Sequence, residues 1–134
     1  MAKLTTIEGI GEAFAEKLKA AGVGSVEALL TKGSTPKGRT EIAANSGVDM
    51  KRIMRFVNHA DLMRVKGIGG EYAELMEAAG VDTVAALARR NPANLHAKMA
   101  EINAEKSLVR QLASVDKVAD WVEQAKALPR EVNY

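Results

Sequence analysis

Apolar residues recur along the chain at every third or fourth position, which is the spacing of amphipathic helices. Glycines and small polar capping residues divide this pattern into separate segments. The predicted helices lie at residues 11–21, 25–32, 39–45, 49–64, 69–79, 83–90, 93–104 and 115–128. No segment between turn signals keeps the two-residue alternation of a strand. The pattern therefore predicts an all-α fold.

The pattern of the first half recurs in the second half. Residues 4–31 align with residues 62–89 without a gap, and 13 of the 28 positions are identical. Further on, Phe56 matches Trp121 at a shift of 65 rather than 58, so the second copy holds seven extra residues, expected within 103–115. A repeat of this length predicts two structural units with the same fold.

We expect two four-helix units, residues 1–61 and residues 62–134. The last helix of the first unit continues into the second copy at Leu62 without a flexible linker, which favours a rigid junction or one compact domain. Only five residues are aromatic, so the core is expected to be mostly aliphatic. The residues predicted to be buried at equivalent places are Ile10, Ile68, Leu18, Met76, Leu29, Leu87, Phe56 and Trp121.

Each copy opens with a turn of glycine, isoleucine and glycine that precedes a helix. The two turns are Gly9-Ile10-Gly11 and Gly67-Ile68-Gly69. Glycine permits the positive φ and the close backbone approach that such a turn needs. The central isoleucine is expected to fill the core beneath the turn. Backbone N–H groups at the start of the next helix are then available to an anion such as phosphate.

This turn, followed four residues later by Ala15 or Ala73, resembles the helix-hairpin-helix motif. The order of elements along most of the chain resembles a bacterial family of unknown function built from tandem helix-hairpin-helix units, with a SAM/HhH-like all-α fold. The resemblance implies that the hairpins hold the DNA backbone without reading its sequence.

Positive charge is concentrated in the middle of the chain. Residues 32–66 contain eight basic and three acidic residues, which is a net charge of +5. The flanking residues 1–31 and 67–134 carry net charges of −1 and −2, and the whole chain carries only +2. Nucleic-acid binding would therefore depend on a local patch.

Residues 39–56 within this patch also resemble a helix-turn-helix. Its second helix is expected to expose Lys51, Arg52, Arg55 and Asn58. Glu8 and Glu12 flank the first glycine turn, whereas Lys66 lies beside the second, so the second turn is expected to be the better phosphate site. The candidate DNA-contacting residues are Lys37, Arg39, Lys51, Arg52, Arg55, Lys66, Gly67 and Gly69.

The residue inventory argues against an enzyme. There is no cysteine, and there are only two histidines, His59 and His96, which are expected on solvated helix surfaces. No phosphate-binding loop, metalloprotease motif or nucleophile elbow is found. The sequence predicts no catalytic residue, no metal site and no cofactor. No apolar run is long enough to span a bilayer, so we expect a cytoplasmic protein that does not bind membranes.

Two functional hypotheses follow. The first is a non-enzymatic, sequence-independent DNA-binding module that uses hairpin amides and the central basic patch. The second is a protein-interaction or assembly module with the same fold, which would bind an acidic protein partner and no nucleic acid.

Overall fold

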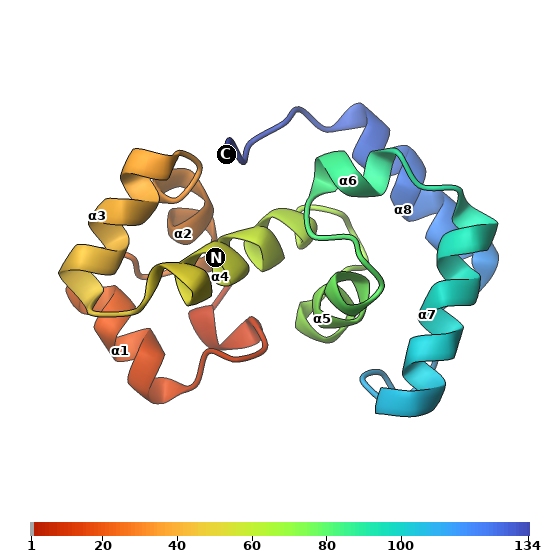
Figure 1. Ribbon diagram of the computed structural model, residues 1–134, viewed down its shortest axis with the longest axis horizontal. Coiled ribbons are helices and arrows are strands. Elements are labelled where there is room, and N and C mark those ends of the chain that lie inside the picture. Colours follow the sequence, from red (N-terminus) through yellow and green to blue (C-terminus); the bar gives the residue numbers. More distant parts are fainter. Residues whose placement is uncertain (1) are drawn as a thin grey trace. The chain divides into compact units, whose positions relative to one another are not determined.

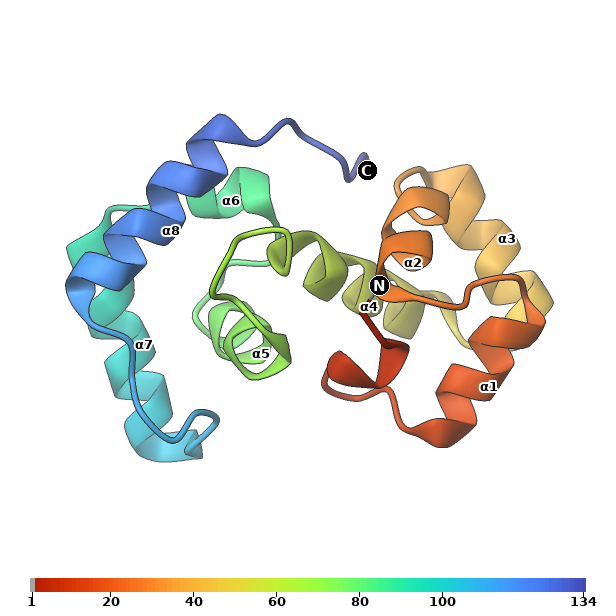
Figure 2. The same ribbon diagram turned by 180° about the vertical axis from the view of Figure 1, so that it is seen from behind.

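The computed structural model describes residues 2–134, and helices are the regular elements of this part of the chain (Figures 1 and 2). They are the 3₁₀ helix η1 (Leu4–Thr6) and the α-helices α1 (Glu12–Ala20), α2 (Val26–Lys32), α3 (Pro36–Ser46), α4 (Met50–Leu62), α5 (Gly70–Ala78), α6 (Val84–Ala88), α7 (Pro92–Lys106) and α8 (Val115–Ala127). The prediction of an all-α fold is confirmed. Among the described residues, no helix is long and apolar enough to cross a membrane.

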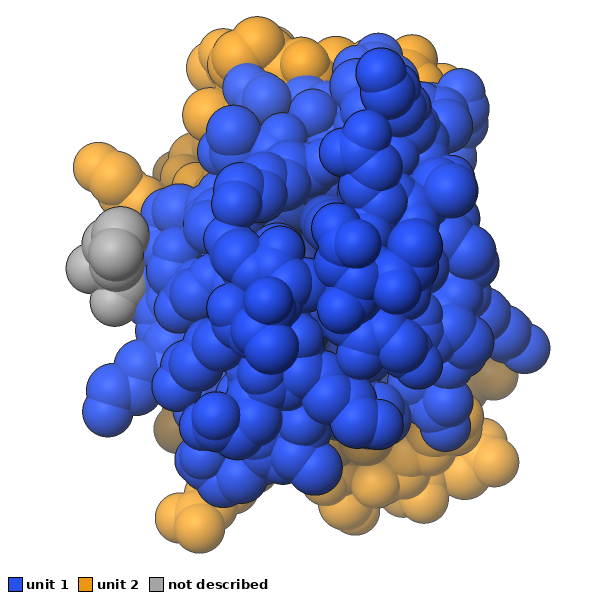
Figure 3. All heavy atoms as spheres, turned by 90° about the vertical axis from the view of Figure 1, so that its left-hand side faces the viewer, with its two compact units in different colours: residues 1–61, 131–134 blue, residues 62–130 orange. Residues whose placement is uncertain are grey.

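The chain divides into two compact units, which Figure 3 colours separately. One unit contains residues 1–61 and 131–134, and the other contains residues 62–130. The sequence repeat placed the boundary between residues 61 and 62, but it assigned the last four residues to the second unit. Those residues pack on the first unit instead, because Asn133 N donates to the Ser34 carbonyl at 2.8 Å and Val132 is buried.

Most helix boundaries lie within two residues of the predicted ones, but α3 begins earlier than expected. The sequence predicted this helix from residue 39, whereas Pro36 occupies the first turn of α3. Proline is well tolerated there because its missing N–H would have no partner in the helix. The Thr35 side chain caps the helix by accepting from Gly38 N at 3.1 Å.

The extra residues of the second copy lie in α7 and in the connection after it. Helix α7 has 15 residues where α3 has 11, and residues 107–114 replace the short connection 47–49. Helix α6 is two residues shorter than α2, which leaves seven extra residues in the second copy. Ser107 ends α7 with a positive φ of 52°. The Asn103 side chain then holds the longer connection by accepting from Val109 N and donating to Val109 O.

An aromatic pair occupies the same place in each unit. Phe14 and Phe56 meet edge to face in the first unit, with ring centroids 6.0 Å apart. Tyr72 and Trp121 do so in the second unit, at 5.1 Å. The eight residues predicted to be buried are all at most 4 % exposed, so that prediction is confirmed.

The two glycine turns have the same conformation. Gly9 and Gly67 adopt φ values of +96° and +102°, in the region that favours glycine. Gly11 and Gly69 are extended, with φ of −90° and −96°, so only the first glycine of each turn is needed for its dihedral angles. In each turn the isoleucine N–H donates at 3.1 Å to the carbonyl three residues earlier.

Alanine substitutions should separate the roles of these glycines. Gly9→Ala should lower the free energy of unfolding by about 1–2 kcal/mol, because a Cβ is disfavoured at this φ. Gly67→Ala should cost more, since its Cβ would also lie 2.7 Å from Trp121 Nε1. Gly11→Ala is the control: its Cβ would meet nothing within 4 Å, and the change should stay within about 0.5 kcal/mol. Urea unfolding measures all three, and equal losses at Gly9 and Gly11 would contradict this account of the turn.

Candidate nucleic-acid interface

The helices that follow the two glycine turns differ from the other helices in how they begin. Gly11 and Gly69 hold the N-cap positions of α1 and α5, and neither cap provides a side-chain hydrogen bond. The other α-helices each begin with a side chain that accepts from a backbone N–H of the first turn. These capping residues are Ser25, Thr35, Asp49, Thr83, Asn91 and Ser114. The positive ends of α1 and α5 are therefore left without a side-chain acceptor.

The space beside these two caps is open. A Cβ at Gly11 or Gly69 would meet no atom within 4 Å, and both residues are exposed. Neither the internal packing nor the dihedral angle requires glycine at these positions. The missing side chain instead leaves the adjacent backbone accessible to a group from outside the protein.

The first turn has arginine side chains from α4 beside it. A Cβ on Gly9 would lie 3.5 Å from Arg55 Nη1, so this guanidinium lies next to the turn. Arg52 lies over the Phe14 ring, with its guanidinium carbon 5.4 Å from the ring centroid. The sequence had favoured the second turn as the phosphate site, because Lys66 was the only base adjacent to a turn along the chain. The packing of Phe14 on Phe56 brings Arg55 of α4 to the first turn as well.

Arg52 forms an ion pair within its own helix. Its Nη1 lies 2.6 Å from Asp49 Oδ1, and its backbone N–H donates to Asp49 Oδ2 at 3.1 Å. The hydrogen bond from the Arg52 side chain is the main cause that holds the pKa of Asp49 below its ordinary value. Lys51 is exposed, and it forms no ion pair with any residue that the structure describes.

Arg39 was predicted to contact DNA, but it is only 3 % exposed. Its Nη1 donates to the Gly33 carbonyl at 2.9 Å, and its Nη2 donates to the Asn133 carbonyl at 2.6 Å. Burial lowers the pKa of Arg39, and the charge of Tyr134 partly opposes this shift. Arg39 therefore fixes the end of the chain to the first unit and does not belong to the exposed basic surface.

Other bases of the central segment also bind backbone carbonyls. Lys32 donates to the Gly22 carbonyl, and Arg64 donates to the Pro129 carbonyl at 2.7 Å. Lys37 is exposed, as predicted. Asn58 was expected on the exposed face of α4 but is buried, at 7 % exposure. The exposed basic surface is thus smaller than the sequence suggested.

At the second turn, the side chain of Gln124 binds the backbone of Lys66. Its Oε1 accepts from Lys66 N at 2.9 Å, and its Nε2 donates to Lys66 O at 3.1 Å, while the Lys66 side chain is exposed. Sequence reasoning missed Gln124, although the 65-residue shift aligns it with His59.

His59 is fully buried rather than solvated, and His96 is half-buried, with Nε2 at 3.0 Å from the Ala113 carbonyl. The prediction for His59 was therefore wrong, whereas His96 lies in the surface helix α7, as expected.

The fold and the repeated turns define an all-helical protein made of two related units. A family model for a domain of unknown function, DUF4332, matches residues 8–128. The chain therefore belongs to the DUF4332 family. No curated protein and no solved structure matches it.

The role of Arg39 can be measured directly. Arg39→Met should lower the free energy of unfolding by about 1–3 kcal/mol, because it leaves two buried carbonyls without their donor. Lys37→Met, at an exposed position of the same helix, is the control and should have little effect. Urea unfolding compares the two variants, and equal stabilities would show that the two hydrogen bonds of Arg39 contribute nothing to the fold.

Proposed function

We propose that the protein is a non-enzymatic module that holds the DNA backbone without reading its sequence. The observation that carries the proposal is the open, uncapped start of α1, with arginines of α4 beside it. Unpaired N–H groups at a helix start suit a phosphate oxygen, and neighbouring guanidiniums add charge-assisted hydrogen bonds. The resemblance of both turns to the helix-hairpin-helix motif supports the same conclusion.

The arginines are needed because the first turn also holds acids. Glu8 and Glu12 are exposed on either side of the glycines and oppose a phosphate there. Arg55 beside this turn adds positive charge against that repulsion, whereas Arg52 over the Phe14 ring is already paired with Asp49. At the second turn, Lys66 is the exposed base. None of these contacts involves the edge of a base, so the binding is independent of sequence.

The second candidate function is a protein-interaction module. Two observations favour it: Asp49 already pairs with Arg52, and Met50 is an exposed apolar side chain, at 44 %, next to Lys51. An apolar residue beside a base suits an acidic protein partner better than it suits a phosphate backbone.

Neutralising the basic residues of α4 tests the first proposal. The triple change of Lys51, Arg52 and Arg55 to Gln should weaken duplex DNA binding about tenfold at low salt. The slope of log K against log salt should also become shallower by about 0.9 for each phosphate that the variant no longer neutralises. Fluorescence anisotropy with labelled duplex and single-stranded DNA at several salt concentrations measures both quantities.

The control changes three exposed bases of the second unit, Lys98, Lys106 and Arg110, to Gln, which removes the same charge. An equal loss of affinity in the control would mean that only net charge matters. If the wild-type protein binds no DNA at low salt, the proposal fails. A titration with a poly-glutamate peptide then tests the protein-interaction function.

Capping the exposed helix starts tests the role of the backbone N–H groups. Gly11→Ser and Gly69→Ser place a hydroxyl at an N-cap with suitable dihedral angles and free space. Serine should stabilise each helix by a few tenths of a kcal/mol while occupying the N–H groups that a phosphate would use. We therefore expect unchanged or higher stability together with weaker DNA binding. A variant that keeps full affinity would show that the helix starts do not contact phosphate.

A further inference from the structure

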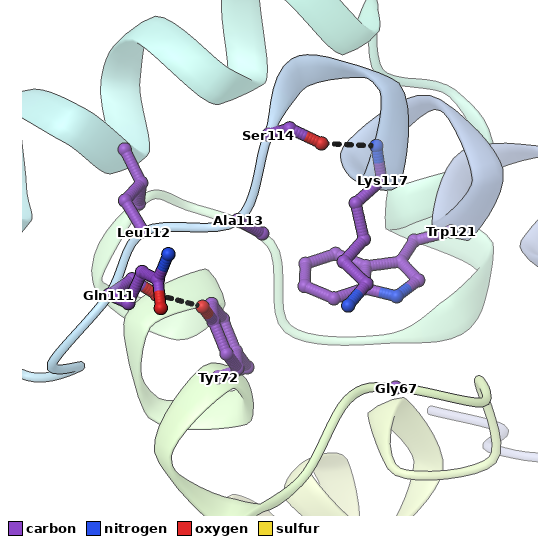
Figure 4. A pocket seen from close by; sticks show the side chains of 8 residues that line it. All are labelled: Gly67, Tyr72, Gln111, Leu112, Ala113, Ser114, Lys117 and Trp121. Atoms are coloured by element: carbon purple, nitrogen blue, oxygen red, sulfur yellow. Dashed lines mark hydrogen bonds between the residues drawn. The ribbon is translucent and has the colours of Figure 1, made fainter.

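The second unit contains an open pocket of about 480 Å³ (Figure 4). It lies between the second glycine turn, the start of α5, the long connection after α7 and the first half of α8. The lining residues are Gly67, Tyr72, Gln111, Leu112, Ala113, Ser114, Lys117 and Trp121. The volume is within the range of small-molecule sites.

The indole N–H of Trp121 faces the open pocket. Trp121 is 1 % exposed, and its Nε1 forms no hydrogen bond with any residue that the structure describes. This nitrogen is at the Gly67 side of the pocket, since a Cβ on Gly67 would lie 2.7 Å from it. Trp121 Nε1 is not one of the fully buried side-chain atoms without a partner, so this N–H reaches the open pocket and can donate to a group that enters it.

The rest of the lining offers positive charge and no negative charge. Lys117 is exposed and forms no ion pair within the described part of the chain, and no Asp or Glu lines the pocket. The Tyr72 hydroxyl donates to the Gln111 carbonyl, which holds the ring and the long connection together as one wall. Figure 4 shows this bond, and it shows the Lys117 amine and the indole nitrogen on the side of the Trp121 ring that faces Gly67.

The first unit provides an internal comparison. By the 58- and 65-residue shifts, the positions of Tyr72, Lys117 and Trp121 are occupied there by Phe14, Arg52 and Phe56. Both phenylalanine rings pack in the same edge-to-face way but carry no hydrogen-bond donor. The packing of this fold therefore does not require the hydroxyl or the indole N–H.

The charge at this place also differs between the units. Arg52 is paired with Asp49, but the residue that aligns with Asp49 in the second unit is Ser114, which leaves Lys117 without a carboxylate. The connection before α8 is longer, and it brings Gln111 and Leu112 to the pocket. The second unit thus has an additional wall around the pocket, and it lacks the aspartate that would pair with Lys117.

We propose that this pocket binds a small organic anion, an aromatic carboxylate or phosphate ester. Its oxyanion binds the Lys117 ammonium and the Trp121 N–H, and its ring lies against Tyr72 and Leu112. The pocket shares Gly67 with the second turn. Lys117 and Trp121, which would bind the anion, are not among the DNA backbone contacts proposed above.

The single tryptophan of the chain makes the test direct. The indole ¹H–¹⁵N resonance of Trp121 is followed by NMR, without DNA, during titrations with phenyl phosphate, benzoate, inorganic phosphate and benzyl alcohol. Phenyl phosphate or benzoate should shift the resonance saturably, and whichever binds more tightly identifies the anion. Inorganic phosphate should bind more weakly because it lacks the ring. The proposal would be overturned if benzyl alcohol shifted the indole resonance saturably and as much as the anionic probes do. It would also be overturned if no probe shifted the resonance at millimolar concentration.

Matched variants then assign the contacts. Lys117→Gln should weaken binding of the better probe about tenfold, the usual effect of losing a charge-assisted hydrogen bond. Arg52→Gln, at the equivalent position of the first unit, should leave the affinity unchanged. Trp121→Phe introduces the phenylalanine that the first unit has at the equivalent position. Calorimetry should show that this variant binds the better probe more weakly, and an unchanged circular dichroism spectrum should show that it is still folded. Equal affinities of wild-type protein and Lys117→Gln would reject the site.

Discussion

Each unit depends on one close contact, between the left-handed glycine of its first turn and the aromatic ring of its last helix. A Cβ on Gly9 would lie 3.5 Å from the Phe56 ring, and a Cβ on Gly67 would lie 2.7 Å from the Trp121 ring. The contact joins the first turn of a unit to its last helix. The same contact brings the bases of α4 to the first turn.

The sequence predicted the helices and their cores well, because both follow from local periodicity and from capping residues. It failed where a distant segment decides the environment of a polar side chain. Arg39 is buried because Asn133, far along the chain, supplies one of its two carbonyl acceptors. His59 and Asn58 occupy positions on an amphipathic helix that appear polar along the sequence but are covered in the fold. No local pattern contains this information.

The candidate interface was predicted in part. Both glycine turns were recognised, but the sequence could not tell which glycine served the turn and which left space beside it. The dihedral angles assign the first role to Gly9 and Gly67, while Gly11 and Gly69 leave the helix starts open. Comparing the caps along the sequence could have found this, since the other helix starts carry serine, threonine, aspartate or asparagine. The position of Arg55 at the first turn required the tertiary structure, because it depends on helix packing.

The two copies show how one fold supports different chemistry. Replacing phenylalanine by tyrosine or tryptophan at a packed position adds a donor that must find an acceptor or be left unsatisfied. Tyr72 donates to the longer connection of the second copy, and the Trp121 N–H faces the open pocket. Replacing the capping Asp49 by Ser114 keeps the helix cap but removes the negative charge. These exchanges preserve the packing and change what the surface attracts. Under the two proposals, both units contact a polyanion at their open turns, and the second unit also binds a single anionic group in its pocket.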